Sequence, residues 1–184
     1  MHHIPSPGGH NLFFVLILST GPPVLESLSA GDQALIETGP LLFFLIGFFI
    51  GALEEIGWRG YAQEALQRRI SVVWASLVIG IFWALWHLPL FFLPGSYQAG
   101  LGVGTPAFWG FNLAIVVGSP LYAWFYNVSG RSVFAPLLFH GLGNVAGEIF
   151  VDAAPLTVII VNILLVLIVV LISRGWMTKT LYPD

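Results

Sequence analysis

The stretch PLTVIIVNILLVLIVVLIS, residues 155–173, contains no charged side chain and a single amide, Asn162. An α-helix needs about 20 predominantly apolar residues to cross the hydrocarbon core of a bilayer. Inside that core every backbone polar group must find its partner within the protein, and an α-helix provides that partner. The stretch therefore predicts a transmembrane helix.

The composition of the whole chain agrees with a protein surrounded largely by lipid. Hydrophobic side chains make up 57% of the 184 residues, charged ones only 8%, and the mean hydropathy is +0.89. An ordinary soluble domain is about 25% charged. The net charge of −3 gives no basic surface for nucleic acid, and the lack of cysteine excludes a thiol nucleophile and a thiolate metal site.

Five apolar runs are candidates for membrane spans. They cover residues 38–57, 71–93, 107–127, 132–151 and 155–173. We expect an all-α integral membrane protein, a bundle of about five transmembrane helices with a short interfacial amphipathic helix around residues 60–70. We expect three parts along the chain: an N-terminal stub (1–37), a core (38–173) and a tail (174–184).

The positive charges predict how these spans are oriented. All six lie in connections that fall on one side of the membrane if the spans alternate. They are Arg59, Arg68 and Arg69 after the first span, Arg131 after the third, and Arg174 and Lys179 after the fifth. Because Lys and Arg are enriched in cytoplasmic loops, we expect the C-terminal tail to be cytoplasmic. The short loops favour a bacterial plasma membrane.

Two adjacent carboxylates and an arginine stand at the end of the first span. Glu55 and Arg59 are four residues apart, so they share a helix face and can form an ion pair. Glu54 lies about 100° away round the helix and is not offered the same partner. Two acids in different surroundings can take different chemical roles. The alternative is an ion pair that only anchors a helix end at the interface.

Further polar side chains interrupt the later spans. His87 lies late in the second span, and His140 and Asn144 share a face of the fourth. Ionisable groups inside spans are costly to bury and are usually functional. Each also has a structural explanation, since a histidine can be a hydrogen-bonded packing residue and an asparagine can join two helices. If the spans alternate, His87 falls on the side opposite to Glu54, unless the span boundaries are shifted or the second span is broken near Pro89.

Three short motifs in these segments resemble those of a known family. EEIGWR (54–59), WALWH (83–87) and HGLGN (140–144) match in order the EExxxR, aromatic-xxx-His and HxxxN/D motifs of the CAAX-processing and bacteriocin-processing (CPBP) intramembrane endopeptidases. The resemblance covers roughly residues 40–173, and Trp83 stands where the family most often has Phe. Family members usually have further spans before the first motif, so an N-terminally truncated member is an alternative to a complete enzyme.

The resemblance implies the hydrolysis of a peptide bond inside the membrane. Glu54 would activate a water molecule as general base, and His87 would orient that water. His140 and Asn144 would donate hydrogen bonds to the oxyanion that forms on the substrate. Three further motif residues would support the site: Glu55, Arg59 and Trp83.

The same residues leave two chemistries open. In the first, the carboxylate activates water without a metal ion. In the second, Glu54, His87 and His140 bind Zn²⁺ and leave a position open for water. We favour the metal-free chemistry, because HxxxN differs from the HExxH motif of zinc proteases, in which two histidines and the base lie on one helix.

The expected partner is a peptide or protein substrate in the membrane. In the eukaryotic relatives that substrate is lipidated, because they process prenylated CAAX proteins, whereas bacterial relatives are linked to bacteriocin immunity and peptide maturation. The competing hypothesis is a non-proteolytic membrane protein, either a transporter or scaffold or a peptide-binding immunity protein. Buried Glu, His and Asn side chains also build ion paths, so the motif residues alone do not separate these classes.

Overall fold

The computed structural model describes residues 45, 48–49, 51–149 and 155–181, and within them every regular element is a helix. The first helical run comprises α4 (Glu54–Gly57), η2 (Trp58–Gln63) and α5 (Glu64–Leu66). The longer helices are α6 (Val72–His87), α8 (Pro106–Val128), α9 (Phe134–Ile149) and α10 (Pro155–Ile172), and the short ones are η3 (Leu88–Phe92), α7 (Tyr97–Leu101) and η4 (Trp176–Thr178).

Three helical segments in the described residues are long and apolar enough to cross a membrane, and they confirm three of the predicted spans. They cover residues 72–92, 106–128 and 155–172. Only 6% of the last segment is buried inside the molecule, and large apolar side chains on its outer face, such as Leu164 and Leu171, are exposed. An exposed apolar helix of this kind requires lipid around it. The protein is therefore an all-α membrane protein, as the sequence predicted.

The other two predicted spans are described less completely. Most of residues 38–57 and all of residues 1–37 lie outside the described residues. The fourth predicted span corresponds to α9, which has 16 residues between Phe134 and Ile149. The described part thus contains three candidate spans, whereas the sequence predicted about five for the whole chain.

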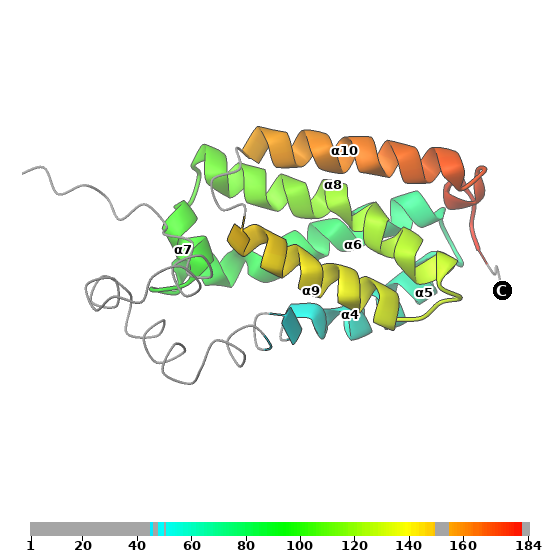
Figure 1. Cartoon of the computed structure of the whole chain (residues 1–184), viewed down its shortest axis with the longest axis horizontal. Coiled ribbons are helices and arrows are strands. Elements are labelled where there is room, and N and C mark those ends of the chain that lie inside the picture. Colours follow the sequence, from blue (N-terminus) through cyan, green and yellow to red (C-terminus); the bar gives the residue numbers. More distant parts are fainter. Residues whose placement is uncertain (1–44, 46–47, 50, 150–154, 182–184) are drawn as a thin grey trace, which may run out of the picture.

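The long helices pack as a layered bundle. α8 lies between α6 and α10 and is packed against both, while α9 contacts α8 and α4 on the other side (Figure 1). α6 and α8 approach closely at Gly80, where an added Cβ would lie 2.9 Å from Val116 Cα. A small residue at such a crossing lets two membrane helices bring their backbones together. The same crossing brings Ser119 of α8 against α6.

The ends of α6 and α8 follow from local sequence signals. Ser71 and Thr105 cap the two helices, each accepting a hydrogen bond from the backbone N–H three residues later. α6 ends at His87, and the chain continues as the 3₁₀ helix η3, which contains Pro89. Proline restricts the residue before it and cannot continue an α-helix ladder. The helix type thus changes after His87, while residues 72–92 remain one segment long enough to cross a membrane. Glu54 is bonded to Trp83 and Trp86 of α6, because the first helical run extends to Leu66, past the predicted boundary at residue 57.

The segment around residues 60–70, predicted to be a short interfacial amphipathic helix, is helical in part. It continues directly from α4 through the π-helix η2 into α5. Gln63 and Gln67 are fully buried, and the side-chain amides of Gln67 and Asn127 of α8 exchange hydrogen bonds at 3.2 and 3.0 Å. The polar side of this helix therefore faces the protein interior. The sequence did not predict that Gln63 and Gln67 would be buried inside the protein, whereas Arg69 is exposed.

The π-helix explains how one face of this helix stays buried over its whole length. Four polar side chains, spaced four residues apart, are fully buried on it: Glu55, Arg59, Gln63 and Gln67. In a straight α-helix a four-residue step turns about 40° past a full turn, so three steps would move the last side chain far from the first. The wider π turn at Trp58–Gln63 reduces this drift, and such turns often occur at functional sites.

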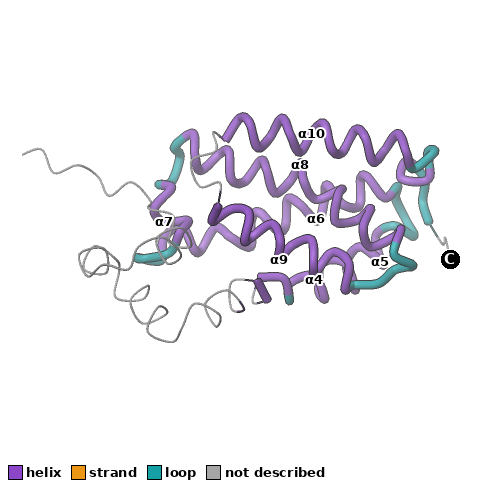
Figure 2. The backbone as a smooth tube through the Cα atoms, viewed as in Figure 1, coloured by secondary structure: helices purple, strands orange, loops and turns teal. Residues whose placement is uncertain are grey.

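The segment after α10 closes one end of the bundle. Met177 is fully buried in a cluster with Val72 and Leu121, and the Leu181 N–H donates to the Gln67 carbonyl at 2.7 Å. The loops that join α5 to α6 and α8 to α9 lie at this same end (Figure 2). The expected tail is thus, as far as residue 181, part of the packed structure. Arg68, Arg69, Arg131, Arg174 and Lys179 all belong to these connections.

Candidate functional site

The centre of the site is a buried ion pair that also holds a histidine. Glu55 and Arg59 are fully buried, and Arg59 Nη1 lies 3.1 Å from Glu55 Oε2. His140 Nδ1 lies 2.9 Å from Glu55 Oε1. Because an ionised carboxylate only accepts hydrogen bonds, this nitrogen carries the hydrogen. The Glu55 carboxylate thus joins an arginine of its own helix to a histidine of α9.

Arg59 is held by α8 as well as by Glu55. Its Nη2 donates to the Ser119 hydroxyl at 2.8 Å, and its guanidinium carbon lies 4.9 Å from the centre of the Trp83 ring and 4.6 Å from that of Tyr122. A planar guanidinium can stack and donate in several directions, which a lysine ammonium cannot do. Burial lowers the pKa of the Arg59 guanidinium below its usual value, and the Glu55 carboxylate opposes that shift.

Glu54 has different partners, as its position on the helix predicted. Trp83 Nε1 donates to Glu54 Oε2 at 2.6 Å, and Trp86 Nε1 donates to Glu54 Oε1 at 3.2 Å. The residue is half-buried. Each carboxylate oxygen has a second lone pair, so Glu54 can still accept from a water molecule. Two indole N–H groups therefore orient a carboxylate that remains accessible.

Trp83 connects the three sequence motifs. Its indole N–H binds Glu54, and its ring packs edge-on against the His140 ring with centroids 5.2 Å apart. Its backbone carbonyl lies 2.8 Å from His87 Nδ1. Since a carbonyl only accepts, His87 Nδ1 is the donor, and a neutral ring then has its lone pair on Nε2. His87, whose position the sequence left open, is joined to the site through Trp83.

His140 and Asn144 lie one turn apart on α9 and approach the same glycine. An ideal Cβ added to Gly51 would lie 2.9 Å from Asn144 Nδ2 and 3.3 Å from His140 Nε2. His140 is buried and Asn144 is half-buried. The two polar side chains that the spacing placed on one helix face therefore point to a common neighbour.

The structure links most of the residues that the motifs singled out through contacts with Glu55 or Trp83, and it adds three more. The predicted Glu55–Arg59 pair is formed, and Glu54, His87 and His140 all contact Trp83. The residues missed from the sequence are Trp86, Ser119 and Tyr122. Only Trp86 carried a signal, because it lies three residues after Trp83. The contacts of the other two depend on the α8 packing, which no motif encodes.

The candidate zinc ligands do not gather as a metal site. In the described part of the chain, no three or more His, Asp or Glu side chains are placed so that they could hold a metal ion. Glu54 is oriented by the two tryptophans, while the His140 Nδ1 hydrogen is directed to Glu55. The donor set therefore does not fit the tetrahedral zinc geometry considered above, and we derive no step through a metal ion.

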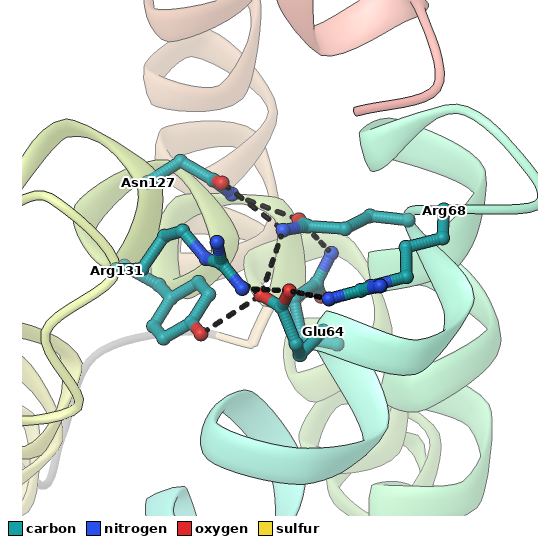
Figure 3. A network of polar contacts seen from close by, with 7 residues as sticks. Glu64, Arg68, Asn127 and Arg131 are labelled. Atoms are coloured by element: carbon teal, nitrogen blue, oxygen red, sulfur yellow. Dashed lines mark hydrogen bonds and ion pairs between the residues drawn. The ribbon is translucent and has the colours of Figure 1, made fainter. Parts of the chain in front are cut away.

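A second polar network lies outside this site, at the end of the bundle that carries the loops (Figure 3). Glu64 of α5 forms ion pairs with Arg131 and, at 3.2 Å, with Arg68. The Tyr126 hydroxyl donates to Glu64 at 3.0 Å, and Asn127 joins through Gln67. The network therefore joins α5 to the end of α8 and to the loop that follows α8.

The fold and the site together define a class of protein, namely a helical membrane protein whose bundle encloses an acid pair, an arginine and histidines from separate helices. The chain belongs to the type II CAAX prenyl endopeptidase Rce1-like family, whose family model matches residues 36–146. This confirms the family that the three motifs suggested.

A relative with a curated description supports the same family. The chain is 36% identical over 123 residues to CAAX prenyl protease 2 of Methanococcus maripaludis. That alignment covers 66% of this chain and 44% of the relative, so the chain spans less than half the length of the relative. No solved structure showed a significant match to the chain.

Proposed function

We propose that the chain is the catalytic core of an intramembrane endopeptidase that hydrolyses a peptide bond with a water molecule activated by Glu54. The observation that carries the proposal is the position of Trp83. One tryptophan binds the accessible Glu54 carboxylate, packs on His140 and holds His87. A general base and an oxyanion donor must lie close to one reacting carbonyl, and this arrangement supports that requirement.

Glu54 is suited to be the general base. Both of its oxygens accept from indole N–H groups, which fix the direction of the carboxylate. Glu54 takes a proton from a water molecule, and the hydroxide adds to the scissile carbonyl. The C–N bond then breaks, and the proton held by Glu54 passes to the leaving amine. His87, with its lone pair on Nε2, orients the attacking water.

His140 and Asn144 are suited to stabilise the oxyanion. His140 already donates from Nδ1 to Glu55, so it can donate from Nε2 only as an imidazolium. The Glu55 carboxylate supports that charge, which gives Glu55 a role beyond anchoring the helix. A preorganised oxyanion donor contributes about 3 kcal/mol to transition-state stabilisation, and Asn144 Nδ2 is the second donor.

The substrate we propose is a membrane-bound peptide whose lipid group brings the scissile bond to the bundle. The relative from Methanococcus maripaludis is described as a CAAX prenyl protease, so a prenylated C-terminal peptide is the first substrate to test. The positively charged connections lie at one end of the bundle (Figure 1). By the positive-inside rule this end, with the C-terminal segment, faces the cytoplasm.

The test uses the purified protein in liposomes with a fluorogenic farnesylated CAAX peptide and the same peptide without the farnesyl group. We expect cleavage by the wild type and no cleavage by Glu54→Ala, although that variant stays folded. A chelator should not change the rate. Equal rates for the wild type and Glu54→Ala would reject Glu54 as the base, and loss of activity with the chelator would reject the metal-free chemistry. Ion flux without cleavage would favour the transporter hypothesis.

A further inference from the structure

Gly51 lies where the two polar side chains of α9 come closest to the segment before α4. A Cβ at this position would lie 2.9 Å from Asn144 Nδ2, closer than real Cβ atoms approach another heavy atom. It would also lie 3.3 Å from His140 Nε2, which is a tight contact. Both nitrogen atoms therefore occupy the space that a Cβ at Gly51 would need.

We propose that Gly51 is a positioning residue, which sets the place of the His140 and Asn144 side chains by having no side chain of its own. The inference rests on the proposed function, because it assigns these two nitrogens to the oxyanion. Any larger residue would push the Asn144 amide away from the position it shares with His140 Nε2. A donor displaced by a few tenths of an ångström no longer matches the position of the oxyanion.

Local backbone preferences do not explain a glycine at this position. Gly51 is in helical conformation, and glycine in a helix is less favourable than alanine because its backbone loses more freedom on folding. Its backbone has no left-handed φ that would require glycine, unlike Gly130 with φ of 73°. The space beside Asn144 and His140 is the remaining reason for a glycine. A change to alanine should therefore improve the helix and harm the site.

Gly57 provides a matched control on the helix that follows Gly51. It lies two residues beyond Glu55, in α4, and an added Cβ there would meet nothing within 4 Å. Gly57→Ala makes the same change in helix preference without contact to the site. A difference between the two alanine variants therefore reports on the neighbours of Gly51 and not on helix formation.

The experiment compares Gly51→Ala, Gly57→Ala, Asn144→Ala and the double variant Gly51→Ala/Asn144→Ala with the wild type on the farnesylated peptide. We expect Gly51→Ala to lower kcat about 10- to 100-fold with little change in KM and an equal or higher melting temperature. Gly57→Ala should keep wild-type kcat. In the Asn144→Ala background, Gly51→Ala should have a much smaller further effect on kcat, since the contact at 2.9 Å is then absent.

A second measurement follows the Asn144 side chain without any peptidase activity. In detergent-solubilised protein labelled on asparagine side-chain nitrogen, the Asn144 amide signal is assigned by its loss in Asn144→Ala. We expect this signal to shift in Gly51→Ala and to stay in place in Gly57→Ala. Wild-type kcat in Gly51→Ala, equal effects of Gly51→Ala in both backgrounds, or an unmoved amide signal overturns the positioning role. A wild type that cleaves no peptide rejects the proposed function instead, and the amide signal then decides the positioning role.

Discussion

Glu55 and His140 are separated by 85 residues in the chain, and their side chains meet inside the bundle with Glu55 Oε1 2.9 Å from His140 Nδ1. The contact joins the first sequence motif to the third. It also links the two helices that carry the proposed base and the proposed oxyanion donors. A substitution at Glu55 should therefore affect the positions of both groups. The adjacent Glu54 makes none of these contacts and is bound by two tryptophans instead.

Glu55→Gln and Glu54→Gln should therefore fail in different ways. Without the Glu55 charge, Arg59 stays fully buried with no carboxylate beside it, and breaking one half of a buried pair costs about 3–5 kcal/mol of unfolding free energy. Glu54 is half-buried, and the single amide oxygen of a glutamine there can still accept from Trp83, while the Trp86 indole that loses its acceptor is exposed. We expect Glu55→Gln to lose both stability and activity and Glu54→Gln to lose activity alone.

Thermal unfolding in detergent and peptide cleavage in liposomes measure the two effects separately. Gln67→Glu is not a useful control, because it would add a buried charge. Arg69→Gln is suitable, because Arg69 is exposed and lies in the turn just after α5. Equal melting temperatures for Glu54→Gln and Glu55→Gln would show that the buried pair contributes nothing to stability.

The sequence predicted which residues form the site better than it predicted the contacts between them. The four-residue spacing predicted the Glu55–Arg59 pair because neighbours at this distance share a helix face. The contact from Glu55 to His140 depends on how α9 crosses α4, which no local pattern encodes. The roles of Gln63 and Gln67 were missed for another reason: their burial continues the Glu55 face only because a π-helix intervenes.

Trp83→Phe and Trp86→Phe test whether the two indoles hold Glu54. Phenylalanine keeps a ring in the bundle but has no N–H, so Glu54 loses one donor in each variant. We expect Trp83→Phe to lower kcat about tenfold and Trp86→Phe to have a smaller effect, because the bond from Trp83 is shorter, at 2.6 Å against 3.2 Å. Steady-state cleavage of the farnesylated peptide provides both numbers.

The control for the tryptophan variants is Trp74→Phe, which changes an exposed tryptophan near the start of the same helix. It should leave kcat unchanged. A Trp83→Phe variant with full activity would mean that the indole N–H does not orient the base. That result would also explain why phenylalanine is common at this position in the family.

Arg59→Lys tests whether the site needs a guanidinium or only a positive charge. Lysine keeps a charge near Glu55, but it cannot donate to Ser119 at 2.8 Å while stacking between Trp83 and Tyr122. We expect a loss of about 1–3 kcal/mol of unfolding free energy and a fall in kcat. Arg59→Ala should cost more, because it leaves Glu55 buried without a partner. A lysine variant with wild-type stability and kcat would show that charge alone suffices.

The fold was predictable where hydropathy and proline decide it. Residues 71–93, 107–127 and 155–173 were recognised because length and apolarity are enough to define a span, and Pro89 indicated the break that follows His87. The segment around residues 60–70 was predicted to be an amphipathic helix, but its pattern does not say which of its polar side chains are buried. In the structure Gln67 finds Asn127, and an amide that is paired inside the protein needs no water.

Glu64→Gln tests the second network as a support that does not touch the chemistry. Glu64 is 16% exposed and accepts from Arg68, Arg131 and Tyr126, so loss of its charge should lower the unfolding free energy by about 1–2 kcal/mol. Glu54 is held by Trp83 and Trp86, and His140 by Glu55, so kcat should stay within about twofold of the wild type at a temperature where both are folded. Salt should reduce the difference in stability, since screening weakens partly exposed pairs. If kcat instead falls tenfold without a change in melting temperature, α5 is coupled to catalysis through the buried face from Glu55 to Gln67.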